Sequence, residues 1–466
     1  MHHDRSARDQ VGIRRAELST APQQLLETLA YTTSPLSEEA STERVDQRGL
    51  KFAYAALLLV AVGRVGELIP GLGSLPLAKV AGGVALVLLI SRWKGLQPLS
   101  PAAAPFIRTI VGLVVLAAVL APIGIWPGKS IGFLYKQLPV MAVSVVTCWK
   151  VAHDWNALRG IIRVLVVSGL ALAATAVLGF GGGRASAGES LDTNDLAYVL
   201  VSLAPLALAF ALTARTRVKR LVNAGVCALM VVAALLTSSR GGFFGLIAVV
   251  ATLIVLPIKR PEAREGEGRS RNRIVLPALG VVCASMLLWP YLPAATRDRL
   301  GSVLQLGNDY NMDPTNKNGR SAIWDRGLQA AQQRPIGYGI LSYPMVDVKM
   351  GGQFRAPHNS YLEVLVELGV VGLLLFLRMY WLCWRALQGV RHSLLAAVPS
   401  NEHDEIIIFA RMLQVALVGN AVAGFFLSMS YANLLWVLFA VVITCVSLVS
   451  AAPPATAPVA LSDTDS

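Results

Sequence analysis

Apolar residues along the chain fall into long blocks separated by shorter polar stretches. The blocks are close to the roughly 20 residues that a helix needs to cross about 30 Å of hydrocarbon. They are rich in Leu, Val and Ala and lack the two-residue alternation of a membrane barrel, so they predict helices. The pattern therefore predicts an all-α, polytopic membrane protein of about twelve transmembrane helices. The blocks run near residues 51–69, 75–91, 106–125, 131–149, 160–180, 195–213, 219–237, 241–258, 274–292, 358–378, 404–428 and 431–450.

The polar segments between these blocks set the domain organisation. Residues 1–50 are polar and mixed in charge, which predicts a disordered tail, and the first nine helices follow in residues 51–292. Residues 293–357 are too many for a turn and predict one large loop with short helices of its own. The last three helices occupy residues 358–450, and the Ala- and Pro-rich residues 451–466 predict a second tail.

Composition agrees with a membrane protein and argues against a water-soluble fold. Hydrophobic residues make up 55% of the chain and charged residues 15%, where a soluble domain carries roughly a quarter charged. The formal charge of +13 is scattered between the apolar blocks and forms no long stripe, so we expect a lipid bilayer and no nucleic acid as partner. The cysteines lie in or beside apolar blocks without metal-ligand spacing and predict small buried hydrophobes: Cys148, Cys227, Cys283, Cys383 and Cys445.

Lys and Arg alternate from loop to loop, which predicts the orientation of the chain. Cytoplasmic loops carry the excess of positive charge. With the N-terminus in the cytoplasm, every inside loop is basic, whereas outer stretches such as 122–130 and 181–195 are nearly free of positive charge. Both termini are then cytoplasmic, the 293–357 loop is extracytoplasmic, and Arg240 lies at the outer end of its helices.

The outer loop carries helix signals of its own. Ser321 predicts the N-cap of a helix over residues 322–333, which Arg334 and Pro335 would end. The glycine-punctuated residues 335–339 then return the chain towards the membrane. A helix lying at the bilayer surface and covering a cavity is the simplest arrangement.

Three polar residues share this outer side: Arg240, Arg320 and His358. Ionisable groups at membrane depth are costly and usually face a cavity or a partner, and His358 is the one histidine placed on this face. Simpler interpretations remain open. His358 could be a helix-start histidine satisfied by backbone or water, Arg240 could snorkel to the interface, and Arg320 could be a surface residue at a helix start. The glycines that follow Arg240 favour close approach of a backbone or a ligand.

Five short strings occur in one order along the chain. They are Thr193-Asn194-Asp195-Leu196-Ala197; Ser239-Arg240-Gly241; Gly319-Arg320 with Trp324; Pro335-Ile336-Gly337-Tyr338-Gly339; and His358-Asn359-Ser360-Tyr361-Leu362-Glu363 with Glu367-Leu368-Gly369. This arrangement resembles the superfamily of O-antigen ligases, O-antigen polymerases and bacterial O-oligosaccharyltransferases. The resemblance covers residues 190–375 in motif and most of the chain in predicted topology.

The resemblance implies glycosyl transfer at the outer face of a bacterial inner membrane. The donor would be a polyprenyl-pyrophosphate-linked glycan, and the acceptor a hydroxyl of a glycan or of a lipid-linked acceptor. Arg240 and Arg320 are candidates for gripping pyrophosphate oxygens, because a guanidinium offers paired hydrogen bonds. His358 is the candidate general base. Attack opposite the leaving group would invert the anomeric centre, and the resemblance implies no metal or other cofactor.

Further residues are candidates for binding the sugar or positioning His358: Asn194, Asp195, Tyr338, Asn359, Tyr361 and Glu363. Helix capping is the alternative for Asn194 and Asp195. Interface anchoring is the alternative for the two tyrosines. Glu363 and Glu367 lie one turn apart and share a helix face.

Two other functional interpretations follow from the same pattern. Asp309 and Asp313 in an Asn-rich loop are a weak metal signal, since no metal-binding motif surrounds them. A twelve-helix secondary transporter or a lipid-linked glycan flippase is the rival class, although transporters usually keep their ionisable residues near the bilayer midplane. Within the favoured class, ligase and polymerase both remain open, and other polysaccharide assembly proteins are possible partners.

Overall fold

The computed structural model describes residues 36–69, 71–73, 75–93, 100–188, 191–256, 290, 293–301, 316 and 319–451, without the side chains of 36–47. Throughout these residues the regular structure is helical, which confirms the predicted fold class. The chain divides into two compact units, residues 1–52 and 53–466, and the sections below concern the second unit.

Among the described residues, eight helices are long and apolar enough to cross a membrane, and α5 and α12 are shorter apolar helices. The protein is therefore a membrane protein. Its spans are helices because a helix satisfies its own backbone hydrogen bonds, which lipid cannot do. The elements are α3 (Leu36–Ala61), α4 (Val65–Leu68), α5 (Leu77–Ser91), η2 (Pro101–Ala103), α6 (Ala104–Ile123), α7 (Pro127–Lys136), α8 (Leu138–Val151), α9 (Trp155–Leu178), α10 (Thr193–Thr213), α11 (Arg217–Leu236), α12 (Arg240–Val255), α14 (Ala294–Gly301), α15 (Arg320–Gln333), α16 (Tyr343–Lys349), α17 (Ser360–Ala396), α18 (Asn401–Gly424) and α19 (Asn433–Ala451).

These helices follow the predicted apolar blocks, with differences at the ends. The 274–292 block, the two aspartates of the weak metal signal and Cys283 lie outside the described residues. Helix α3 begins at Leu36, within the segment expected to be a disordered tail. The 131–149 block is two helices, α7 and α8, because Pro139 lacks a backbone N–H and is tolerated only in the first turn of α8.

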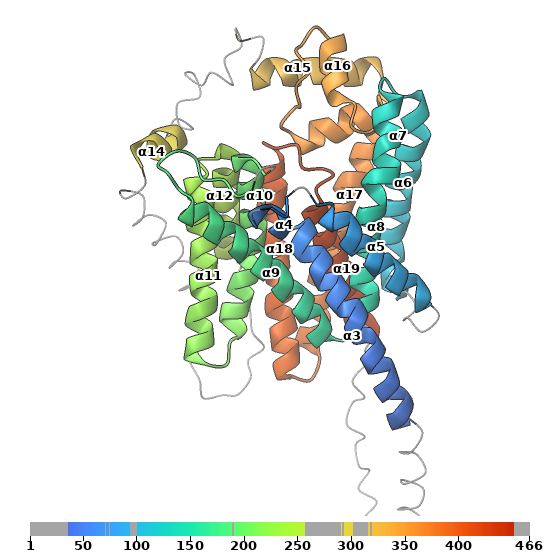
Figure 1. Ribbon diagram of the computed structural model, residues 1–466, viewed down its shortest axis with the longest axis vertical. Helices are drawn as coiled ribbons and strands as arrows, with labels where there is room; N and C mark the ends of the chain where they lie inside the picture. The colour runs from blue at the N-terminus through green and yellow to red at the C-terminus, as the bar shows by residue number, and fades with distance from the viewer. Residues whose placement is uncertain are drawn as a thin grey trace, which may run out of the picture. The chain divides into compact units, whose positions relative to one another are not determined.

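Helices α10 and α18 form the centre of the bundle. In the most apolar stretch of each helix, 89% of the residues are buried in α10 and 83% in α18. The share is 33% in α11, which is therefore peripheral. Helix α10 packs against α9, α11, α12 and α18, and α17 packs against α6, α18 and α19 (Figure 1). The short helices α15 and α16 pack on each other and on the beginning of α17.

Helix α15 begins earlier than the sequence predicted. The N-cap residue is Gly319, and the expected cap at Ser321 was wrong. The Ile323 amide already donates to the Gly319 carbonyl at 3.1 Å, so Ser321 lies inside the first turn. The helix ends at Gln333 as predicted, because the following Arg334-Pro335 cannot continue it.

Helix α17 is broken at Gly369, where φ is 70° and ψ is −171°, a conformation open essentially to glycine alone. The loop of residues 335–339 fills the break with backbone hydrogen bonds of 2.9 Å each. The amides of Tyr338 and Gly339 donate to carbonyls of residues 366 and 367, and the Val370 amide donates to the Pro335 carbonyl. The polar backbone groups freed by the break are thus satisfied within the protein.

The Glu367 side chain secures the same joint. Its buried carboxylate accepts hydrogen bonds from the amides of Leu341 at 2.8 Å and Tyr343 at 3.0 Å, and from the Tyr431 hydroxyl at 2.9 Å. The two strings that the sequence analysis singled out separately, residues 335–339 and 367–369, are therefore the two halves of one joint.

Replacing Gly369 with alanine is expected to destabilise the protein by about 2–4 kcal/mol, from backbone strain and overpacking. The added Cβ would overlap the Pro335 carbonyl. Gly389→Ala in the same helix is the matched control, since a Cβ there meets nothing within 4 Å and alanine favours helix by about 1 kcal/mol over glycine. The midpoint of thermal unfolding in detergent is measured for both variants. Equal midpoints would contradict the role of Gly369 in the joint.

Candidate functional site

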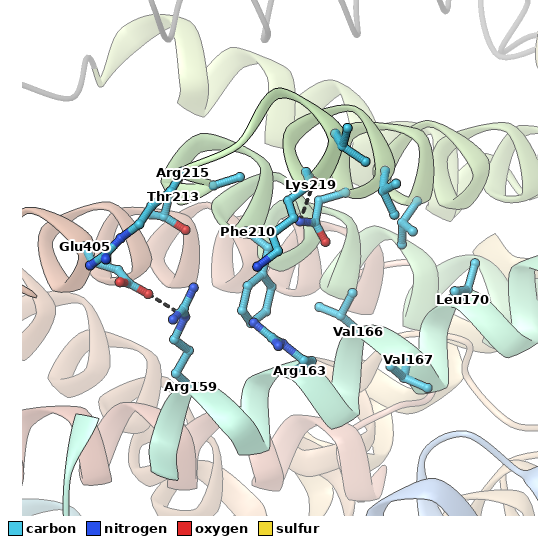
Figure 2. Close-up of a pocket in the computed structure, with 15 residues that line it drawn as sticks. Arg159, Arg163, Val166, Val167, Leu170, Phe210, Thr213, Arg215, Lys219 and Glu405 are labelled. Atoms are coloured by element: carbon cyan, nitrogen blue, oxygen red, sulfur yellow. Dashed lines mark hydrogen bonds and ion pairs between the residues drawn. The ribbon is translucent and has the colours of Figure 1, made fainter. Parts of the chain in front are cut away.

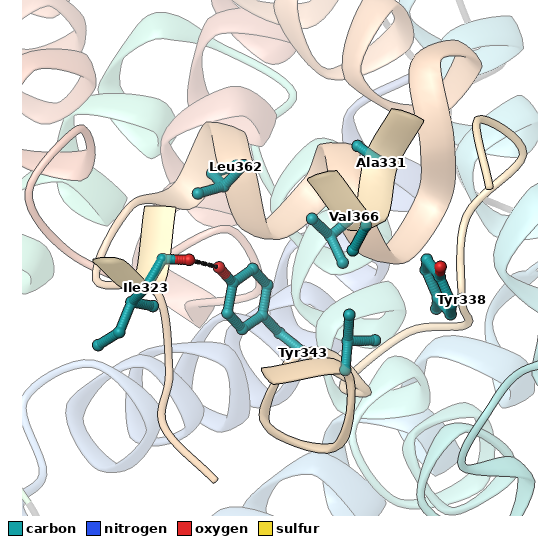
Figure 3. Packing of buried hydrophobic residues seen from close by; sticks show 8 residues of the cluster. Ile323, Ala331, Tyr338, Tyr343, Leu362 and Val366 are labelled. Carbon is teal, nitrogen blue, oxygen red and sulfur yellow. Dashed lines mark hydrogen bonds between the residues drawn. The ribbon is translucent and has the colours of Figure 1, made fainter. Parts of the chain in front are cut away.

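An apolar cluster joins α15 and α16 to the beginning of α17. In it, the Tyr343 hydroxyl donates to the Ile323 carbonyl at 2.8 Å (Figure 3). The cluster holds α15 in one register against α17, so the first residues of α15 lie near the first residues of α17. Its buried members are Ile323, Ala330, Ala331, Tyr338, Tyr343, Val346, Leu362 and Val366.

Trp324 fixes the chain immediately before His358. The indole nitrogen of Trp324 donates to the Pro357 carbonyl at 2.8 Å. Arg320 is four residues before Trp324 on α15 and therefore shares its helix face. Asn359 then caps α17, with its side-chain oxygen accepting from the amides of Tyr361 and Leu362 at 3.0 Å each. These contacts place Arg320 and His358 near each other, and the charge of Arg320 acts on His358.

His358 has an unusual backbone and a lowered pKa. Its φ is 48°, in the left-handed region that few non-glycine residues occupy and that often marks functional positions. Burial, followed by the charge of Arg320, lowers the pKa of His358 from its ordinary 6.5, while Asp192 acts in the opposite direction and Arg355 lowers the pKa further. A lowered pKa favours the neutral imidazole, which is the form that can accept a proton.

Arg184 is a member of this site that the sequence analysis missed. Its guanidinium donates to the Asn194 side-chain oxygen at 2.8 Å and to the Thr237 carbonyl at 2.9 Å. Burial and the charges of Arg299 and Arg320 lower the pKa of Arg184, whereas Asp192 raises it. The signal in the sequence was a single arginine in a predicted outer loop otherwise free of positive charge.

Asp192 takes the capping role considered for its neighbours. Its carboxylate accepts from the amides of Asn194 at 2.6 Å and Asp195 at 2.8 Å at the start of α10. Asn194 and Asp195 lie in the first turn of the helix instead. The Asn194 side chain is held by Arg184, so Asn194 belongs to the same cluster.

Arg240 joins the cluster through α14. Its Nε donates to the Arg299 carbonyl at 3.5 Å, and the Ser238 hydroxyl donates to the Thr296 hydroxyl at 2.9 Å, which ties the start of α12 to α14. Added Cβ atoms on the glycines after Arg240 would crowd Phe426 and Ala197. Those glycines therefore admit neighbouring helices.

The result is a series of electrostatic contacts that begins at His358 and runs through Arg320 and Arg184 to Arg299. Electrostatic interactions connect Arg184 to Arg299 and Arg320, and Arg320 to His358, while Asp192 acts on both Arg184 and His358. An excess of guanidinium groups over carboxylates suits a phosphate-bearing ligand. No set of three His, Cys, Asp or Glu side chains suited to a metal ion is found in the described part of the chain.

The remaining candidates have structural partners. The Glu363 carboxylate is buried and accepts from the Ser430 hydroxyl at 2.6 Å, and the Tyr361 hydroxyl donates to the Ala421 carbonyl at 2.8 Å. Tyr338 is 2% exposed and packs against Arg334 and Lys349, which leaves its ring little surface to offer a sugar. Tyr361 instead holds α17 against α18, and Glu363 holds it against the turn that follows α18.

Residues 225–377 match the family model described as O-antigen ligase. This match supports the resemblance to the O-antigen ligase and polymerase superfamily. It covers about a third of the chain, from α11 to the middle of α17, and includes Arg240, Arg320 and His358. Arg184 and Asn194 lie outside it. No curated protein matches the chain.

Removing one charge near His358 is expected to move its pKa in a direction set by the sign of that charge. Arg320→Gln should raise the pKa, and Asp192→Asn, which keeps a capping side chain, should lower it. Diethyl pyrocarbonate acylates neutral imidazole, so peptide mapping of acylated His358 against pH measures the shift. Arg385→Gln on the exposed face of α17 is the control. If the acylation of His358 had the same pH midpoint in Arg320→Gln and Asp192→Asn, the proposed electrostatic contacts of His358 would be contradicted.

Proposed function

We propose that the protein is a membrane glycosyltransferase of surface polysaccharide assembly. It moves glycan from a polyprenyl-pyrophosphate carrier to an acceptor hydroxyl. The observation that carries the proposal is the position of His358, next to the Pro357 carbonyl that Trp324 of α15 binds and within the field of Arg320, in a chain whose 225–377 segment matches the O-antigen ligase model. The same family resemblance supports a bacterial inner membrane with the site on the periplasmic face.

The proposed reaction uses these residues in separate roles. The acceptor oxygen forms a bond to the anomeric carbon while its proton passes to a ring nitrogen of His358. The bond between that carbon and the pyrophosphate oxygen breaks, and the oxygen keeps the electron pair. Arg240 and Arg320 stabilise the negative charge that develops there, with Arg184 and Arg299 adding to the local potential. Attack from the side opposite the leaving group inverts the anomeric centre.

Fixed guanidinium groups provide the charge neutralisation that other transferases obtain from a divalent ion. Arginine stays charged at any relevant pH and grips phosphate oxygens in pairs. The proposal therefore includes transfer without a metal ion, supported by the charge interactions of Arg320 with His358 and with Arg184.

His358→Ala is expected to abolish transfer, a loss of about 10²–10⁴-fold for a missing general base. A strain lacking the protein is complemented with the variant, and surface glycan is resolved on a gel at matched protein level. His392→Ala on the exposed part of α17 is the control. Single repeat units left on the carrier would identify a polymerase, and stranded full-length glycan a ligase. Wild-type surface glycan from His358→Ala would overturn the proposal.

Replacing Arg240 and Arg320 with lysine is expected to lower kcat by about 10–100-fold at each position. Lysine keeps the charge but loses the second hydrogen bond, and a charge-assisted bond contributes about 1.5–3 kcal/mol. The purified protein is assayed on lipid-linked glycan, with Arg385→Lys as the control. If both variants kept full kcat, these arginines would not contact the leaving group.

A further inference from the structure

A second group of cations lies at the opposite end of the spans from His358. Helix α10 begins at Thr193, beside the candidate site, and ends at Thr213, about 30 Å away at the helical rise per residue. At that end, a groove of about 720 Å³ opens between α9 and α11 (Figure 2). This groove is separate from the site described above.

Four cations line the groove: Arg159, Arg163, Arg215 and Lys219. The guanidinium groups of Arg163 and Arg159 lie 5.0 and 5.8 Å from the centre of the same Phe210 ring, which holds them in place. Arg159 pairs with Glu405 at 2.5 Å. Among the described residues, Glu405 is the one carboxylate that lines the groove, so positive charge is left in excess.

The rest of the groove is apolar and faces outward. Helix α9 contributes Val166, Val167 and Leu170, and α11 contributes valines at one-turn spacing. The side chains of Val167, Val218 and Val222 are 45, 72 and 60% exposed. Because both helices are membrane spans, these side chains face lipid. The groove therefore has a charged end at headgroup level and an apolar wall that extends from it towards the bilayer interior. Along α9 this wall is about 10 Å long, from Arg163 to Leu170.

We propose that this groove binds an anionic phospholipid. The headgroup phosphate is held by Arg163, Arg215 and Lys219, and an acyl chain lies along the valines of α9 and α11. Basic pockets between spanning helices are the form of site that recognises such headgroups. The excess of positive charge selects the anion, and the exposed apolar wall selects a lipid over a soluble phosphate.

The test compares two double variants that remove the same charge. Arg163→Gln with Arg215→Gln alters the groove, whereas Arg217→Gln with Arg220→Gln alters the same end of α11 at positions that do not line the groove. Purified, delipidated protein is titrated with phosphatidylglycerol or phosphatidylcholine, and retained lipid is counted by native mass spectrometry. The groove variant should bind phosphatidylglycerol roughly 10–30-fold more weakly, and the control variant less than about threefold.

Three results would overturn the proposal. Equal weakening in both double variants would mean attraction by surface charge alone. Equal retention of the two lipids by the wild type would mean that the cations do not select an anion. Full displacement of phosphatidylglycerol by millimolar inorganic phosphate would mean that the apolar wall contributes nothing. Val222→Ser tests the wall directly and should weaken binding of phosphatidylglycerol but not of glycerol phosphate.

Discussion

The need to satisfy backbone polar groups within the membrane governs the joint on which the candidate site depends. Helix α17 breaks at Gly369, and each freed group needs a partner because lipid supplies none. The 335–339 loop provides those partners, and Glu367 accepts two further loop amides. The break therefore fixes the direction of the first turns of α17, and with them the position of His358.

The same joint links residues far apart in sequence into one electrostatic unit. Once α15 is packed on α17, Arg320 lies near His358, and its charge lowers the pKa of the imidazole. Arg184 and Asp192 reach the group from the loop before α10. Placing several guanidinium groups together costs repulsion and desolvation. A bound pyrophosphate would relieve that repulsion, which is why the arrangement favours an anionic ligand over a purely structural role.

The sequence predicted the spans well, because apolar blocks of membrane length leave the chain few other structures. It also singled out Arg320 and His358 as candidates, since a fixed charge and a lone histidine on the outer side stand out in such a chain. It missed Arg184, whose role comes from contacts with Asn194 and Thr237 that only the packing of α10 and α11 creates. It assigned the cap of α15 to Ser321, because local propensity does not show which residue begins the turn. It could not show that residues 335–339 and Gly369 meet.

Arginines gather at both ends of the bundle, and the surroundings of each group decide what it can bind. Beside His358, the guanidinium groups lie among loops and short helices, next to an imidazole whose neutral form is favoured by its lowered pKa. In the groove between α9 and α11, they lie over an aromatic ring at the start of an exposed apolar wall. The first setting can stabilise charge that develops during a reaction. Among the described residues that line the second setting there is no histidine, and its one carboxylate, Glu405, is paired with Arg159. It therefore suits binding of a lipid that does not react.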